Sequence, residues 1–337
     1  MKISHILLIT FIICLGISNS CKKEEPGIEE KDGWYALTSE FSSETLYSVF
    51  FIDENKGYIV GTGGLIINTL NSGLNWTKQT SNTTDTIRSV HFVNENTGYT
   101  VGSNGIILKT IDGGTNWVKQ ISGTDQDLSS VFFTSENTGY VIGKSGLILK
   151  TTDGGTNWLI QISGTSNDFN SVWFTDTDKG FIVGNNGTIL KTADGGNSWE
   201  LKLQSTNKNL ASVCFPENDI GYIVGIKKEY SDDDIILKTL NGGINWTQIK
   251  SDNSFRALHF VNANIGFAVS GYRQTTKAAI YKTVDGGTTW TGNTSIVKEL
   301  YSIYFIDENT GFSVGFDRDS KINILKTKNG GEYLLNP

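Results

Sequence analysis

A sevenfold internal repeat is the feature that most constrains the fold of this chain. The run Leu46-Tyr-Ser-Val-Phe-Phe51 returns in similar form from Ile87, Leu128, Phe169, Leu210, Phe255 and Leu300, at intervals of 41 and then 45 residues. Two further runs recur in each unit, typified by Gly57-Tyr-Ile-Val-Gly61 and Ile106-Ile-Leu-Lys-Thr110. A repeat of about 40 residues indicates a solenoid, a propeller or an array of small domains.

Each repeat has the pattern of four short antiparallel strands. The recurring runs are rich in β-branched and aromatic residues, and Gly, Asn and Asp turns bound them. Strands A, B and C are the three runs in chain order, and strand D is expected to start at the tryptophan that follows strand C. One blade cannot bury both of its faces, whereas seven blades in a ring can. The sequence therefore predicts an all-β, seven-bladed β-propeller over residues 34–337, with four antiparallel strands per blade.

The start of the repeat region offers a strand that can close the ring. Gly33-Trp-Tyr-Ala-Leu-Thr38 resembles a strand D with no blade before it. The last unit ends with a shortened run, Tyr333-Leu-Leu-Asn-Pro337, which has Leu334 where tryptophan is expected. We expect the N-terminal run to pair in the seventh blade, because this would join both chain ends and protect a sheet edge.

The turn between strands C and D recurs as Thr-x-Asp/Asn-Gly/Ser-Gly-x-x-Trp. A short Asp or Asn side chain accepts backbone N–H bonds in a tight turn, Gly supplies positive φ, and the tryptophan fills the wedge between strands. Asn71, Asn241 and Asn329 replace the acid in three of the copies, so we predict a structural role and no catalytic one. The residues with this structural role are Asp112, Asp153, Asp194, Asp285, Trp76, Trp117, Trp158, Trp199, Trp246 and Trp290.

These motifs carry a resemblance to known propeller families. The turn resembles the Asp box, or bacterial neuraminidase repeat, of sialidase-type propellers. The whole unit, Gly-Tyr-x-Val-Gly-x-x-Gly-x-Ile-Leu-Lys-Thr-x-Asp-Gly-Gly-x-x-Trp, is similar to the photosystem II stability/assembly factor family over about residues 34–337. The resemblance implies a non-enzymatic seven-bladed propeller that binds newly made membrane-protein chains and has an arginine patch on one face. This chain departs from the family in having only four arginines.

The first twenty residues have the pattern of an export signal. The apolar run from Ile6 to Ile17 suits the h-region of a signal peptide and is too short to span a bilayer. Ser18-Asn-Ser-Cys21 then resembles a bacterial lipobox, with Ser18 in the place of the usual Leu. We predict a lipoprotein signal peptide over residues 1–20, lipid attachment at Cys21 and a flexible tether over residues 21–33. The alternative is a plain secretory signal with an incidental cysteine.

The signal peptide and the cysteine that follows it predict a lipid-anchored protein of the cell envelope, at the outer membrane. The stretch Lys22-Lys-Glu-Glu25 resembles the surface-export signal of some lipoproteins, which favours exposure at the cell surface. Removal of residues 1–20 leaves Cys21 and Cys214, so no structural disulfide is expected. Cys214 lies in a strand-like run and is predicted to be a buried small apolar residue.

Charge and residue spacing exclude several classes of function. A net charge of −7 with few arginines disfavours a nucleic-acid surface, which needs a dense basic patch. His91 and His259 stand alone in equivalent strands, without the spacing of metal ligands, so neither metal nor cofactor is expected. No pair of carboxylates is marked out for glycoside hydrolysis, so no catalytic residue is assigned.

Sequence variation predicts on which face a partner binds. Antiparallel order places the B–C and D–A connections on one face and the near-identical A–B and C–D turns on the other. The B–C loops lengthen in repeats 5, 6 and 7, and the second residue of strand A, expected near the central opening, also varies. Drift in solvated hairpins is the alternative explanation. The candidate binding residues are Tyr47, Arg88, Asn170, Arg256 and Tyr301 in strands A, and Lys227, Lys228, Tyr230, Tyr272, Arg273, Lys277, Phe316 and Arg318 in or beside the loops.

Together these patterns predict a non-enzymatic, envelope-anchored protein-binding or assembly scaffold. The expected partner is a protein or a glycan, besides the membrane that holds the lipid anchor, and the expected state is a monomer. The alternative is a sialidase-like glycoside hydrolase or a glycan-binding adhesion module.

Overall fold

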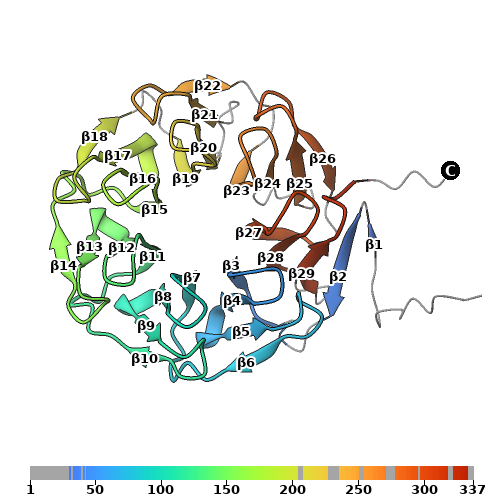
Figure 1. The fold of residues 1–337 in the computed structure, drawn as a ribbon, viewed down its shortest axis with the longest axis horizontal. Coiled ribbons are helices and arrows are strands. Elements are labelled where there is room, and N and C mark those ends of the chain that lie inside the picture. Colours follow the sequence, from blue (N-terminus) through green and yellow to red (C-terminus); the bar gives the residue numbers. More distant parts are fainter. Residues whose placement is uncertain are drawn as a thin grey trace, which may run out of the picture.

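Seven sheets arranged in a ring around a central axis make up the computed structural model (Figure 1). The structure describes residues 30–31, 33–38, 41, 43–203, 208–226, 235–249, 254–270, 278–294, 297–317 and 322–332. Six sheets have four strands and one has five, and all of their strand pairs are antiparallel. The predicted seven-bladed β-propeller is therefore confirmed.

Each blade runs from strand A at the axis to strand D at the rim. Strands A are β3 (Leu46–Phe51), β7 (Ile87–Phe92), β11 (Leu128–Phe133), β15 (Phe169–Phe174), β19 (Asn209–Cys214), β23 (Phe255–Phe260) and β27 (Glu299–Phe305). Strands B are β4 (Gly57–Gly61), β8 (Gly98–Gly102), β12 (Gly139–Gly143), β16 (Gly180–Gly184), β20 (Gly221–Ile226), β24 (Gly266–Ser270) and β28 (Gly311–Phe316).

The outer strands are shorter and more variable. Strands C are β5 (Ile66–Thr69), β9 (Ile107–Thr110), β13 (Ile148–Thr151), β17 (Thr188–Thr192), β21 (Ile235–Thr239), β25 (Ala279–Thr283) and β29 (Ile322–Thr327). Strands D of blades 1 to 6 are β6 (Thr77–Gln79), β10 (Val118–Lys119), β14 (Leu159–Gln161), β18 (Glu200–Leu203), β22 (Thr247–Ile249) and β26 (Thr291–Thr294). These six strands begin one residue after the tryptophan and not at it, because the tryptophan still belongs to the turn.

A β-bulge recurs in all seven strands A, at the second residue in five blades and at the third in β19 and β27, which begin one residue earlier. In β3 the register passes from Leu46 opposite Gly61 to Ser48 opposite Val60, so Tyr47 has no partner across the ladder. The first, fourth and sixth residues of β3 are buried, while the second, third and fifth remain partly exposed. A bulge re-aims the side chain of the extra residue, which matters for the site described below.

Aromatic side chains fill the wedge between neighbouring blades. Tyr58 of β4 stacks on Phe92 of β7 with ring centroids 3.9 Å apart, and Trp117 meets Phe92 edge-on at 5.9 Å. The same stack and the same edge-on contact recur at other blade boundaries. Aromatic pairs of this geometry add about 0.5–1.5 kcal/mol each beyond the apolar area that they bury.

The C–D turn holds its own shape and also ties one blade to the next. Asp112 Oδ1 accepts the backbone N–H of Asn116 at 2.9 Å, which closes the turn. Gly113 follows with φ of 66°, a conformation that other residues adopt only at a cost. The hydroxyl of Tyr58 in the preceding blade donates to the carbonyl oxygen of Gly113 at 2.8 Å. Equivalent bonds to the next turn are made by Tyr99, Tyr140 and Tyr222.

The seventh blade takes its outer strand from the beginning of the chain. β2 (Trp34–Thr38) pairs antiparallel with β29, as the sequence predicts, and β1 (Glu30–Lys31) adds a fifth strand outside β2. Trp34 meets Phe305 edge-on at 5.9 Å, just as the other turn tryptophans meet their phenylalanines. Trp34 thus takes the place of the tryptophan that the seventh turn lacks. Residues 333–337, including Leu334, lie outside the described residues.

The residue three positions after the bulge of each strand A faces the axis, and these residues form a layer of mostly aromatic side chains. The members of this axial layer are Phe50, His91, Phe132, Trp173, Cys214, His259 and Tyr304. His91 lies between Phe50 and Phe132, with ring centroids 5.3 and 4.9 Å away, and His259 lies 4.6 Å from Tyr304. Burial lowers the pKa of both histidines to about 4. Both imidazoles are therefore neutral at pH 7.

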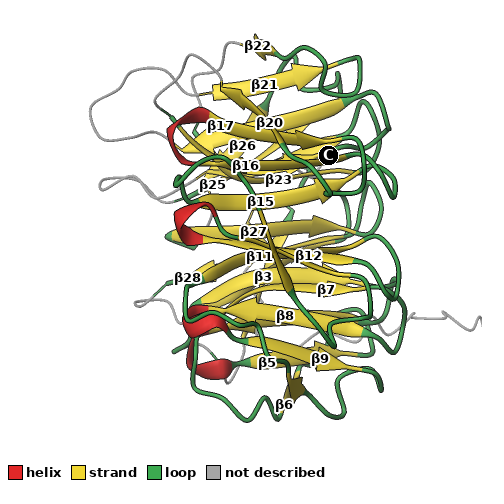
Figure 2. Ribbon diagram, turned by 90° about the vertical axis from the view of Figure 1, so that its left-hand side faces the viewer, coloured by secondary structure: helices red, strands yellow, loops and turns green. Residues whose placement is uncertain are grey.

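The two faces of the ring carry different connections. Four 3-10 turns, η1 (Thr62–Gly64), η2 (Ser103–Gly105), η3 (Lys144–Gly146) and η4 (Asn185–Gly187), connect strands B and C of blades 1 to 4. They lie together on one face, and the A–B and C–D turns lie on the opposite one (Figure 2). We call the first face the mouth face and the second the turn face.

Candidate binding site at the mouth of the ring

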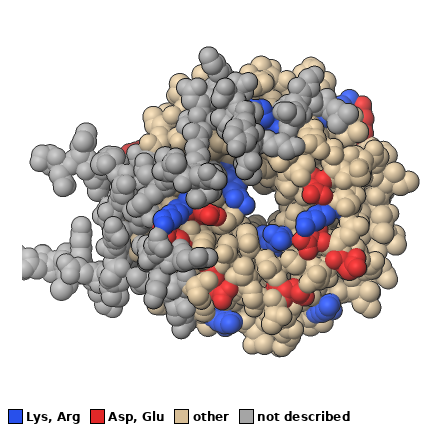
Figure 3. Space-filling view, turned by 180° about the vertical axis from the view of Figure 1, so that it is seen from behind, with Lys and Arg blue, Asp and Glu red and all other residues tan. Residues whose placement is uncertain are grey.

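Five candidate residues from the sequence converge at the central opening of the mouth face. Tyr47, Arg88, Asn170, Arg256 and Tyr301 line one pocket of about 270 Å³. Each is the bulged residue of its strand A, so the bulge is what aims it at the opening. The lining is completed by Ser129, Asn185, Asn209 and Ala211. Figure 3 looks onto this face and shows positive and negative side chains around the opening.

One side of the mouth is a continuous cationic and aromatic arc. The guanidinium carbon of Arg256 is 3.9 Å from the ring centroid of Tyr301. The rings of Tyr301 and Tyr47 are 5.1 Å apart, and the guanidinium carbon of Arg88 is 5.5 Å from the Tyr47 ring. We call Arg256, Tyr301, Tyr47 and Arg88 the mouth arc. A guanidinium that stacks on a ring keeps its N–H groups available in its own plane.

Arg256 has no acidic partner among the residues that the structure describes. No hydrogen bond or ion pair from this part of the chain reaches its guanidinium, and the ring of Tyr301 is its main contact. The nearby carboxylate of Glu299 accepts a hydrogen bond from the Tyr301 hydroxyl instead. Burial lowers the pKa of Arg256 from its usual value, yet an arginine remains charged in a protein. A partly buried cation without a partner favours the binding of an anion.

The other charged groups of the mouth are already paired. Arg88 lies 3.6 Å from a carboxylate oxygen of Asp127, and Lys144 holds the same oxygen at 2.9 Å. The amine of Lys144 is the main reason why the pKa of Asp127 is lowered. Arg256 is therefore the member of the mouth arc that forms no ion pair with a described residue, although the nearby charge of Glu299 acts on its guanidinium.

The side of the mouth opposite the arc is small and neutral. Ser129 donates its hydroxyl to the carbonyl oxygen of Phe169 at 2.6 Å. Asn170 Nδ2 donates to the carbonyl oxygen of Leu210 at 2.7 Å, and Ala211 is apolar. These side chains shape the pocket, but their polar groups are engaged with the backbone.

The structure leaves part of the predicted binding face untested. Phe316 ends β28 opposite Glu299 and is not among the described residues that line the mouth. Asn185 and Asn209 line the mouth although sequence analysis did not select them, because it selected the lengthened B–C loops of repeats 5 to 7 and the variable second residue of strand A. Lys227, Lys228, Tyr230, Tyr272, Arg273, Lys277 and Arg318 lie outside the described residues, as does Cys21.

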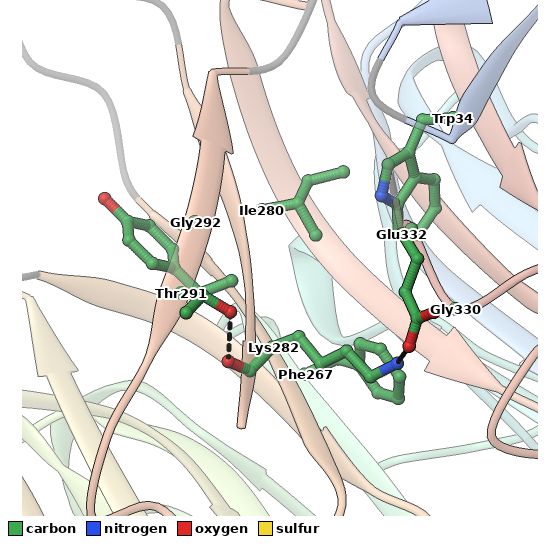
Figure 4. Close-up of a pocket in the computed structure, with 10 residues that line it drawn as sticks. Trp34, Phe267, Ile280, Lys282, Thr291, Gly292, Gly330 and Glu332 are labelled. Carbon is green, nitrogen blue, oxygen red and sulfur yellow. Dashed lines mark hydrogen bonds and ion pairs between the residues drawn. The ribbon is translucent and has the colours of Figure 1, made fainter. Parts of the chain in front are cut away.

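A larger pocket at the rim has a different character. It measures about 380 Å³, lies between blades 6 and 7, and is lined by Trp34, Phe267 and Ile280 among others (Figure 4). Its two charged side chains, Lys282 and Glu332, form an ion pair with each other at 2.8 Å. The mouth is the stronger candidate site, since Arg256 forms no ion pair with any residue that the structure describes.

Metal or acid–base chemistry finds little support in the described part of the chain. No group of three or more His, Cys, Asp or Glu side chains is gathered there as metal ligands are. The described lining of the mouth contains neither Asp nor Glu, whereas glycoside hydrolysis uses two facing carboxylates. Across the same residues, no helix has the length and apolar character needed to cross a membrane.

Comparison with solved structures supports the fold. YCF48 from Cyanidioschyzon merolae aligns with a TM-score of 0.69 at 20% identity, over 88% of this chain and 98% of that one. A structure of YCF48 bound to D1 peptide aligns with a TM-score of 0.70 at 20% identity, over 89% and 96%. The GH74 xyloglucanase from Xanthomonas campestris aligns with a TM-score of 0.72 at 12% identity, and this chain spans about half of its length, 55%.

Sequence comparison gives the family. No curated protein matches the chain. A family model described as photosynthesis system II assembly factor YCF48 matches residues 79–165 and 159–297, which together make up more than half of the sequence. The chain therefore belongs to the YCF48 family of photosynthesis system II assembly factors.

Proposed function

We propose that this protein is a non-enzymatic scaffold that binds an acidic segment of a partner protein at the mouth arc. Membership of the YCF48 family supports a role in protein binding or assembly, and a YCF48 has been solved with D1 peptide bound. The observation that carries the proposal is the Arg256 guanidinium, stacked on Tyr301 and without an acidic partner in the described chain. A carboxylate in the plane of a guanidinium accepts two parallel N–H bonds, which gives both affinity and orientation.

The dimensions of the mouth favour a side chain over a folded domain. A pocket of about 270 Å³ accommodates one or two side chains of an extended segment. Tyr47 and Tyr301 offer ring surface to the apolar part of the same segment, as aromatic residues commonly do in interfaces. The chemistry of the mouth thus fits a segment with Glu or Asp next to an apolar residue.

Replacing Arg256 with glutamine tests this proposal. The change Arg256→Gln should weaken binding of a fluorescent Glu-rich peptide by about 30-fold or more, because removal of one partner from a charged hydrogen-bonded pair costs about 2–5 kcal/mol. Fluorescence anisotropy gives the dissociation constants. Lys119→Gln is the matched control, because it removes the same charge from exposed strand β10 at the rim.

The ligand has its own control. A peptide in which Gln replaces every Glu should bind wild-type protein weakly. Equal affinity for the two peptides, or equal affinity of Arg256→Gln and wild type for the Glu-rich peptide, would refute the proposal.

A photo-reactive residue in place of Ala211, which lines the mouth, should also form cross-links to a polypeptide in intact cells.

We further propose that no glycoside hydrolysis takes place at the mouth. The described lining lacks a carboxylate, and the likeness to a GH74 xyloglucanase at 12% identity extends to the fold alone. Incubation with xyloglucan and with a fluorogenic sialoside should release no product. Turnover of either substrate that disappears in Arg256→Gln would favour the hydrolase alternative.

We also propose that Cys21 carries the lipid that anchors the protein to the cell envelope. The apolar run before it and the Ser18-Asn-Ser-Cys21 motif support this. The variant Cys21→Ala should move from the membrane fraction to the soluble fraction, as measured by immunoblot of fractionated cells. An intact-mass measurement of wild type that shows an unmodified Cys21 would contradict the proposal.

A further inference from the structure

The mouth arc crosses the boundary at which the ring closes. Tyr301 belongs to blade 7 and Tyr47 to blade 1, and their rings meet across this boundary. The backbone N–H of Val49 in blade 1 donates to Ser302 Oγ in blade 7 at 3.3 Å. The outer strand of blade 7 is β2, so the last and the first blade are held together by the N-terminal segment.

The buried side-chain amide of Asn323 forms hydrogen bonds with the connection that leads from β2 to β3 and the mouth. Asn323 of β29 has 0% exposed surface, and its Nδ2 donates to the carbonyl oxygens of Phe41 and Glu44 at 2.8 and 3.1 Å. Phe41 is buried among the apolar side chains of this boundary. The same segment continues into Thr45 and then β3, so Asn323 holds the backbone three residues before Tyr47.

The amide of Asn323 is unusual at its position in the repeat. The equivalent residues of strand C in the other blades are Leu65, Ile106, Leu147, Thr188, Ile235 and Ala279. A buried amide is unfavourable unless its polar atoms are hydrogen-bonded, and here the bonds go to the closing segment. Asn323 is thus a feature of the closure and not of the general repeat.

We propose that docking of β2 regulates the mouth, and that Asn323 is the positioning residue through which it does so. The inference rests on the proposed function for its ligand. While β2 is paired with β29, the pinned connection sets Tyr47 against Tyr301 and completes the mouth arc. Release of β2 separates these two rings and weakens the site. By thermodynamic linkage, an acidic segment bound across the boundary stabilises the docked strand to the same extent.

The variant Asn323→Leu tests the coupling. Leucine is the residue at the equivalent position of blade 1, so it suits an apolar site but leaves both carbonyl oxygens without their donor. We expect faster hydrogen exchange at residues 43–48 and 299–302 and about tenfold weaker binding of the Glu-rich peptide. Val141→Ala, a change at a fully buried position of blade 3, controls for a general loss of stability. It should leave the exchange of these residues and the affinity unchanged.

A disulfide across the closing strands gives the reverse test. Ala36 and Leu325 are directly opposite each other in β2 and β29, so cysteines at both positions should lock β2 in place. In a protein that keeps Asn323 but carries Trp34→Ala, which weakens the pairing of β2 with β29, oxidation should restore wild-type affinity, and the reduced form of the same protein is the control. Because the two forms share every substitution, a loss of packing cannot account for the difference.

The outcomes separate this proposal from the proposed function. If wild type binds neither peptide, the proposed function fails, and the exchange at Tyr47 and Tyr301 still decides whether closure sets the mouth. If wild type binds the Glu-rich peptide and Asn323→Leu has the same affinity and exchange as wild type, the coupling is wrong and the proposed function stands. Peptide binding that fails to slow exchange in β2 would also overturn the coupling.

Discussion

Replacing Trp34 with alanine is expected to lower the free energy of unfolding by about 3–5 kcal/mol, the range for truncation of a buried tryptophan. Trp34 is 5% exposed and packs edge-on against Phe305, whose other contact is the stacked ring of Phe267 at 3.4 Å. It is also the first residue of the strand that closes the ring, so a cavity here weakens the pairing of β2 with β29. Urea unfolding followed by intrinsic fluorescence measures the change.

A comparison of Trp34→Ala with Trp290→Ala separates the loss of ring closure from a general loss of stability. Trp290 makes the same edge-on contact with Phe260 at 6.0 Å, but its blade is continuous in sequence. Trp290→Ala should therefore destabilise the protein without faster hydrogen exchange in β2, whereas Trp34→Ala should accelerate that exchange. Trp34→Phe should recover part of the lost stability. An unchanged melting temperature in Trp34→Ala would show that β2 does not hold the ring closed.

Acidification from pH 7 to pH 4 is expected to destabilise the protein through the two histidines of the axial layer. Burial lowers the pKa of His91 and of His259 from 6.5 to about 4 in the folded protein. The unfolded chain therefore binds more protons than the folded chain between these values. The stability that comes from keeping each imidazole neutral is fully present above pH 6.5 and is lost as the pH falls towards 4. A shift of this size corresponds to about 3 kcal/mol for each histidine.

Phenylalanine at both positions should remove this pH dependence. Phe50 and Phe132 occupy the same place in neighbouring blades, so the axial layer already accepts this side chain. The free energy of unfolding of the double variant His91→Phe/His259→Phe should be nearly flat between pH 7 and pH 4.5, whereas that of wild type should fall. The aspartates of the turns become protonated only at lower pH, since the pKa of Asp194 and of Asp285 is lowered to about 2. A double variant with the wild-type pH profile would exclude the histidines as the cause.

Local rules in the sequence were enough to predict the ring and its closing strand. Asp112 and Gly113 specify a turn whose shape is set by a few neighbouring residues. Because the same motif recurs in each of the seven repeats, the sequence predicts this turn in every blade. Trp34 was readable as part of a displaced strand D because Gly33-Trp-Tyr resembles the start of other D strands. The bulged residues of strands A were placed near the opening from their position in the repeat, and Arg256 and Tyr301 do meet there.

The rest of the site depends on contacts that the repeat does not encode. Asn323 stands out as an amide at a mostly apolar position, but its partners Phe41 and Glu44 lie 282 and 279 residues away in sequence. Asn185 begins η4 and Asn209 begins β19, positions at which neither loop length nor the variable strand residue marks a binding role, and they meet in the mouth only in the assembled ring. The environment of Arg256 is likewise a property of the assembled ring, since the ring of Tyr301 that stacks on it and the Glu299 carboxylate that accepts the Tyr301 hydroxyl belong to the next blade.

The chain order of the closing strand has a consequence for biosynthesis. β2 leaves the ribosome before all seven strands A, and its partner β29 leaves it only after blades 1 to 6. Blades 1 to 6 are built from neighbouring segments and can form in turn, while β2 lacks its partner until β29 has been made. Contacts between such distant segments form late, because the entropy of closing the intervening loop opposes them. Closure of this ring therefore ends with a single long-range step, and a chaperone that shields β2 until β29 has been made would act on that step.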